Sequence, residues 1–187
     1  MANAVIQANH ALLQDVGIES DVLAALIANG RFAIDAPENL LFLSNNTTLS
    51  QVTGTIRHAG NHAPVGVAQE AIFDAFGSQE YLPGKTFARL MDADPATLTD
   101  AQRTLRGQIF DQAEKLAIDL RDYTNQAIVD GRLTLTKTDP KYAGLSAADA
   151  DAAWNADIAK VYGKSTDGFA AFDGGRQKRS GRGEGGC

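Results

Sequence analysis

The sequence predicts an α+β fold that is mostly α, and three observations lead to this class. Long stretches place apolar residues at helical spacing behind recognisable capping residues. One short apolar run, NLLFL, suits a strand. The composition is 44% hydrophobic and 21% charged, which is enough apolar material to bury a core. We expect a compact part over 1–77, a helical extension over 78–173 packed on or beside it, and a disordered Gly-rich basic tail over 174–187.

The first 45 residues are predicted to hold two strands and a helix. An extended or irregular segment carries Asn9 and His10. A helix then begins after Ser20, a good N-cap, and ends at Asn29-Gly30. The run 31–43 predicts two strands, RFAI and NLLFL, around a turn at Asp35-Ala36-Pro37.

A longer helix is predicted over about 56–76. Its expected inward residues are Val67, Ile72, Phe73 and Phe76. Pro64 lies inside this range, so the sequence predicts either a kink there or a later start of the helix.

Two capped helices are predicted in the extension. Thr99 and Gln102 form a capping-box pattern ahead of a helix that runs to about residue 129 and ends near Gly131. Ser146 caps a second helix, whose apolar side carries Trp154 and Tyr162. We assign the apolar stripe of the first of these helices to the core.

Charge and cysteine content limit the possible functions. A net charge of −6 disfavours a protein that grips phosphates over a wide surface. A local basic patch or a bound metal could still serve catalysis on nucleic acid. The single cysteine, Cys187, excludes an intrachain disulfide and a cysteine metal cluster. We see no signal peptide and no apolar run long enough to cross a bilayer, so no membrane partner is expected.

The three histidines are the main clue to chemistry. His58 and His62 are four residues apart in HAGNH, so on a helix they share a face and could bind one divalent metal. The alternative is two polar surface histidines beside a glycine. His10 follows Asn9 near the start of the sequence and could act as a general base, because its unperturbed pKa is close to neutrality.

Two further residues complete the candidate site. Asn39 opens the apolar strand and could hold the His10 imidazole in one tautomer; the alternative is a turn residue after Pro37-Glu38. Arg57 adjoins His58 and could contact a phosphate of nucleic acid; the alternative is a solvated surface arginine.

Three segments together resemble the HNH/endonuclease VII superfamily, and specifically its AHH-like bacterial toxin nucleases. They are ANH at 8–10, IDAPENLLFLSNN at 34–46 and HAGNH at 58–62, and the resemblance covers about residues 5–76. It implies a ββα-metal (His-Me finger) core with His10 as the base, Asn39 as its orienting residue, and His58 and His62 at the metal.

The sequence departs from this family at the residue before the base. The family commonly places a histidine or an acid there as a metal ligand, and this chain has Asn9. An amide oxygen is a poorer ligand for zinc-like ions than for Mg²⁺, so Mg²⁺, Zn²⁺ and Ni²⁺ all stay open, as does whether Asn9 is a natural or an inactivating residue. The usual Ile-Pro after the base is also replaced, by Ala11-Leu12-Leu13.

The resemblance implies a metal-dependent endonuclease that acts on DNA in preference to RNA. It also implies an antibacterial toxin module that would be made in the bacterial cytoplasm, delivered into a target cell, and neutralised by a cognate immunity protein. The alternative is a helical binding or adaptor protein whose histidines are structural or hold a non-catalytic metal. The acidic charge and about 100 residues of mostly helical sequence without a motif favour that alternative.

Overall fold

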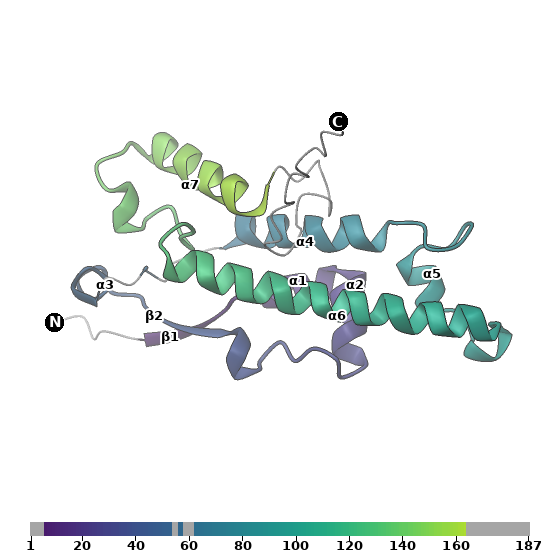
Figure 1. Cartoon of the computed structure of the whole chain (residues 1–187). Coiled ribbons are helices and arrows are strands. Elements are labelled where there is room, and N and C mark those ends of the chain that lie inside the picture. Colours follow the sequence, from purple (N-terminus) through teal and green to yellow (C-terminus); the bar gives the residue numbers. More distant parts are fainter. Residues whose placement is uncertain (1–5, 54–55, 58–61, 164–187) are drawn as a thin grey trace, which may run out of the picture.

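A computed structural model describes residues 6–53, 56–57 and 62–163 of the chain (Figure 1). The fold is mostly helical with a small antiparallel sheet, as predicted. His58 and the predicted tail 174–187 lie outside the described residues.

The sheet consists of β1 (Ile6–His10) and β2 (Leu40–Ser44), which pair antiparallel with His10 opposite Leu40 and Asn9 opposite Leu41. Two helices separate these strands in sequence, α1 (Gln14–Glu19) and α2 (Asp21–Ala28). The predicted strand NLLFL is therefore confirmed, but its partner is the segment that carries Asn9 and His10.

The prediction that RFAI forms a strand is wrong. The backbone of Arg31 and Phe32 instead completes the end of α2, because both amides donate to the Leu26 carbonyl. Gly30 makes this reversal possible with φ +67°, a left-handed conformation that glycine adopts without strain. These amides therefore cap a helix end and are not available to a strand ladder.

The long helix predicted over 56–76 begins late. Helix α4 spans Ala63–Gly77, with Pro64 in its first turn, where the missing proline amide costs nothing. The sheet is joined to it through α3 (Thr47–Thr53). Of the predicted inward residues, Val67 is exposed, and Val65 is buried in its place.

The extension contains both predicted capped helices. Helix α6 (Asp100–Val129) has the predicted capping box at Thr99 and Gln102, and α7 (Ala147–Tyr162) is capped by Ser146. Among the described residues, the remaining elements are the short helix α5 (Phe87–Met91) and three 3-10 turns, η1 (Pro37–Asn39), η2 (Pro95–Thr97) and η3 (Pro140–Tyr142).

The helices pack in layers around one hydrophobic core. Helix α2 contacts both α4 and α6. Helix α7 packs on α4 at the same end of the molecule as the sheet (Figure 1). Helix α5 lies at the opposite end, against the C-terminal end of α4 and the N-terminal half of α6. The buried cluster runs from Leu12 to Tyr162, so the N-terminal part and the extension share one core.

Candidate active site

His10 lies at the end of β1 on the outer face of the sheet. Side chains alternate between faces along a strand, so His10 shares this face with Ala8 and with Phe42, which is 69% exposed. The His10 side chain itself is 18% exposed. Its Nε2 lies 2.8 Å from Oδ1 of Asp35, a carboxylate in the loop before β2. Sequence reasoning assigned Asp35 to a turn and missed this contact.

The ionised Asp35 carboxylate fixes the tautomer of the neutral His10 ring. A carboxylate only accepts hydrogen bonds, so the proton of the neutral imidazole must be on Nε2 and the lone pair on Nδ1. The hydrogen bond from His10 and a second one from Gln14, at 3.1 Å, hold the pKa of Asp35 below its ordinary value. Nδ1 is therefore the His10 nitrogen that can accept a proton.

Asn39 acts on the backbone that follows His10. It is fully buried; its Oδ1 accepts from the Leu12 amide at 2.8 Å, and its Nδ2 donates to the carbonyls of Leu12 and Ile34 at 3.1 and 2.7 Å. Both amide hydrogens are thus used. The Asn39 side chain points into the core, so the imidazole donates its hydrogen bond to Asp35 and not to Asn39.

Asn9 points to the opposite face of the sheet from His10. It is 4% exposed, and its Nδ2 donates to the His10 carbonyl at 3.0 Å. The atom with which it could coordinate a metal is Oδ1. Asn9 and the His10 ring therefore lie on different sides of the same strand.

His62 is the N-cap residue of α4, one position before the helix begins. Its Nδ1 lies 2.7 Å from the Leu135 carbonyl oxygen. A carbonyl only accepts, so Nδ1 carries a proton and the neutral ring has its lone pair on Nε2. The described helix starts at Ala63, so His62 lies just before it and not within it. His58, the other histidine of HAGNH, lies outside the described residues.

Arg57 is bound to both backbone and side-chain groups of the protein itself. Its amide donates to Oδ2 of Asp139 at 2.9 Å, and its guanidinium donates to the Asn45 carbonyl at 3.3 Å and to Thr138. Residue 57 also forms an isolated bridge with Ser44 of β2. These contacts favour a structural role over the predicted phosphate contact.

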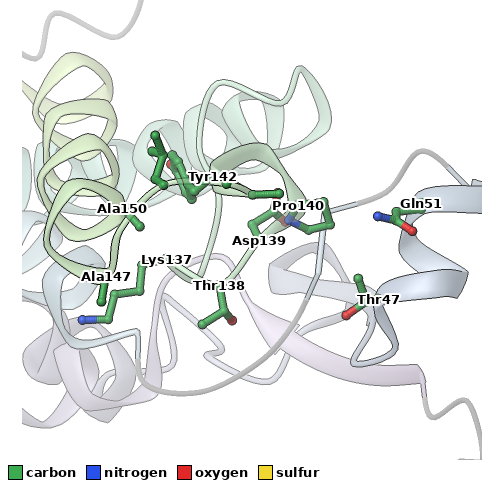
Figure 2. A pocket seen from close by; sticks show the side chains of 12 residues that line it. Thr47, Gln51, Lys137, Thr138, Asp139, Pro140, Tyr142, Ala147 and Ala150 are labelled. Carbon is green, nitrogen blue, oxygen red and sulfur yellow. The ribbon is translucent and has the colours of Figure 1, made fainter.

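A cavity of about 430 Å³ lies near these Arg57 partners. Figure 2 shows Thr47 and Gln51 of α3 on one side, and Thr138, Asp139 and Pro140 on the other. The lining includes none of the five described site residues predicted from sequence.

Possible metal donors do not cluster in the described part of the chain. There, no group of three or more His, Cys, Asp or Glu side chains is arranged to hold an ion. The contact of His62 with the Leu135 carbonyl is typical of a metal-binding histidine. Metal-bound histidines almost always donate one ring nitrogen to a carbonyl, carboxylate or water.

Comparison with known proteins finds no matching family model, no matching curated protein and no matching solved structure. Within the described residues, no helix has both the length and the apolar content needed to cross a membrane.

Proposed function

We propose that this protein is a metal-dependent endonuclease that hydrolyses phosphodiester bonds, with His10 as its general base and a ββα-metal arrangement around it. The observation that carries the proposal is the His10–Asp35 pair at 2.8 Å on the outer face of the sheet. A base held in one tautomer by a carboxylate, and partly open to solvent, has what proton abstraction from water requires.

The protein's own residues would act as follows. Nδ1 of His10 takes a proton from the attacking water, and Asp35 stabilises the imidazolium that forms. Asn39 holds the chain at Leu12, so it positions the base through the backbone. The exposed outer face of the sheet leaves room for a substrate beside His10.

His58 and His62 would hold the divalent ion, with Asn9 as a possible oxygen donor. When bound, such an ion offsets charge on the scissile phosphate and on the leaving oxygen. The contact between His62 Nδ1 and the Leu135 carbonyl supports this role, because metal-bound histidines almost always donate one ring nitrogen to a carbonyl, carboxylate or water. Mg²⁺, Zn²⁺ and Ni²⁺ are all candidates.

The substrate and setting rest on the motif resemblance. ANH, the Asn-led strand and HAGNH support DNA as the substrate and an antibacterial toxin as the biological role, with a cognate immunity protein as partner. The strand pairing also supports the proposal. ANH lies in β1 and LLFLS forms β2, and these two strands pair with each other.

Nicking of supercoiled plasmid tests the proposal. The parent protein should nick plasmid with added Mg²⁺, Mn²⁺ or Ni²⁺ and stop when EDTA is present. His10→Ala should reduce the rate by ~10²–10⁴-fold, the usual effect of a general base, and keep the circular dichroism spectrum of the parent.

Two results would overturn it. Cleavage by His10→Ala at the parent rate would remove His10 as the base. No cleavage by the parent with any of the three ions would favour the adaptor alternative, in which Asn39 and Arg57 serve only the structural contacts described above.

A further inference from the structure

Gln69 is a polar residue inside the apolar stripe of α4. Its neighbours on this stripe, Val65, Ile72 and Phe73, belong to the hydrophobic core, and Gln69 itself is 0% exposed. A buried amide costs stability unless its hydrogen-bonding atoms have partners. The partners of Gln69 are therefore the key to its presence.

Those partners lie immediately after His10. Gln69 Nε2 donates to the Ala11 carbonyl at 2.6 Å, and Gln69 Oε1 accepts from the Leu13 amide at 3.2 Å. Asn39 binds the residue between them, through both the amide and the carbonyl of Leu12. We call residues 11–13 the post-His10 segment.

Every backbone polar atom of the post-His10 segment has a partner. The Ala11 amide donates to the Asn39 carbonyl at 2.8 Å, and the Leu13 carbonyl accepts from the Val16 amide at 3.1 Å. The segment is neither helix nor strand, so these side chains replace a regular hydrogen-bond ladder. The backbone that carries His10 is thereby fixed from two directions, by the β2 side and by α4.

The Gln69 amide is itself held by the two long C-terminal helices. Its Nε2 lies 3.3 Å from the Tyr162 hydroxyl of α7 and 3.5 Å from Thr124 Oγ1 of α6, and these two hydroxyls are 2.9 Å apart. The Ala11 carbonyl only accepts and the Leu13 amide only donates, so these two groups decide which end of the Gln69 amide faces each of them. The two hydroxyls accept from Nε2 and hold the amide in that place. The Tyr162 hydroxyl is neutral near pH 7, as tyrosine ordinarily is, and burial raises its pKa further, to about 12.

We propose that Gln69 is a positioning residue for His10, and that Tyr162 and Thr124 act through it, so that α6 and α7 form part of the site. The expected effect on catalysis rests on the proposed nuclease function. Helices α6 and α7 thereby gain a role, although the extension carries no motif of its own.

The test compares Gln69→Leu and Tyr162→Phe with the control Tyr81→Phe. Tyr81 is a suitable control because its hydroxyl donates to the Phe76 carbonyl at the far end of the same helix α4. The first readout is the ¹⁵N NMR spectrum of the His10 ring at mildly alkaline pH, which distinguishes the two neutral tautomers. The second is the separation of kcat from KM in plasmid nicking.

We expect both site variants to weaken the preference for the Nε2–H tautomer, while Tyr81→Phe keeps the parent spectrum. We expect kcat to fall by ~10–100-fold in Gln69→Leu and by ~3–10-fold in Tyr162→Phe, with KM within ~2-fold, since small misplacements of a reacting group are costly. If Gln69→Leu does not fold, Tyr162→Phe alone decides the result.

The outcomes separate this inference from the proposed function. Suppose that the parent protein does not cleave plasmid, but the His10 spectrum still changes in both site variants. This result would remove the nuclease function and support the positioning role. Suppose instead that the parent protein cleaves plasmid and that Tyr162→Phe has the same His10 spectrum and the same kcat as the parent. This result would overturn the positioning role and leave the nuclease function standing.

Discussion

The two halves of the candidate site are held in place by different kinds of contact. The post-His10 segment is bound by two amide side chains, Asn39 and Gln69, that are both 0% exposed. Arg57 and His62 are instead bound at partly buried positions by the loop 135–139, through the Leu135 carbonyl, Thr138 and Asp139. Loss of a partner costs more in the first case, because water cannot easily replace it.

The largest effect should come from Asn39→Ala. This change leaves the amide and carbonyl of Leu12 and the carbonyl of Ile34 without the partners that now bind them. We expect a loss of about 3 kcal/mol in the free energy of unfolding, since each unsatisfied buried group costs ~1–3 kcal/mol. Urea denaturation measures this, and a loss below ~1 kcal/mol would mean that water reaches the segment.

The next effect concerns alkaline stability. The pKa of Tyr162 is raised from 10.0 to about 12 in the folded protein. The contribution of its protonated hydroxyl to the free energy of unfolding is therefore complete below pH 10 and is lost as the pH rises towards 12. Two pKa units correspond to about 2–3 kcal/mol. Tyr162→Phe should therefore lose less stability than the parent between pH 10 and 12. Equal slopes of unfolding free energy against pH would contradict this.

A smaller effect is expected in the second half of the site. Asp139 accepts from the amides of Arg57 and Lys141, so Asp139→Ala removes both an anchor for Arg57 and the N-cap of η3. We expect a loss of ~1–2 kcal/mol. The matched control is Asp94→Ala, because Asp94 also precedes a proline and caps η2, but is exposed. A similar loss in both variants would show that the Arg57 anchor contributes nothing.

The smallest effect concerns the titration of Asp35. Its side chain is 74% exposed, yet hydrogen bonds from His10 and Gln14 hold its pKa below the ordinary value. The resulting stabilisation is present above about pH 4 and disappears as the pH falls through the lowered pKa; solvent keeps it small. NMR titration of the Asp35 carboxyl carbon in His10→Ala should give a higher midpoint than in the parent. An unchanged midpoint would place the imidazole away from Asp35.

Local signals in the sequence predicted the helix ends well. Ser20, Thr99 and Ser146 all accept hydrogen bonds from the first turns of the helices they were expected to cap. Such signals depend on residues three positions apart, which the chain itself brings together. The strand NLLFL was also recognisable, because it is a compact apolar run.

Contacts between distant segments could not be predicted in the same way. RFAI has a strand-like composition, but the end of α2 uses its first two amides. Asp35 looks like a turn residue in sequence, and its contact with His10 depends on the pairing of β1 with β2 across two helices. Gln69 did carry a detectable signal: a polar residue four positions after Val65 and three before Ile72 interrupts an apolar stripe.

The contact between Gln69 and Tyr162 has a consequence for synthesis of the chain. Ribosomes build the N-terminal residues first, and about 150 residues separate His10 from Tyr162. At ~5–20 residues per second, that distance takes roughly 8–30 s. During this time the hydroxyl that holds Gln69 in place does not yet exist. A nascent chain therefore carries His10 long before the completed site, and under the proposed nuclease function a ribosome-bound fragment that ends before α7 should be much less active than the finished protein.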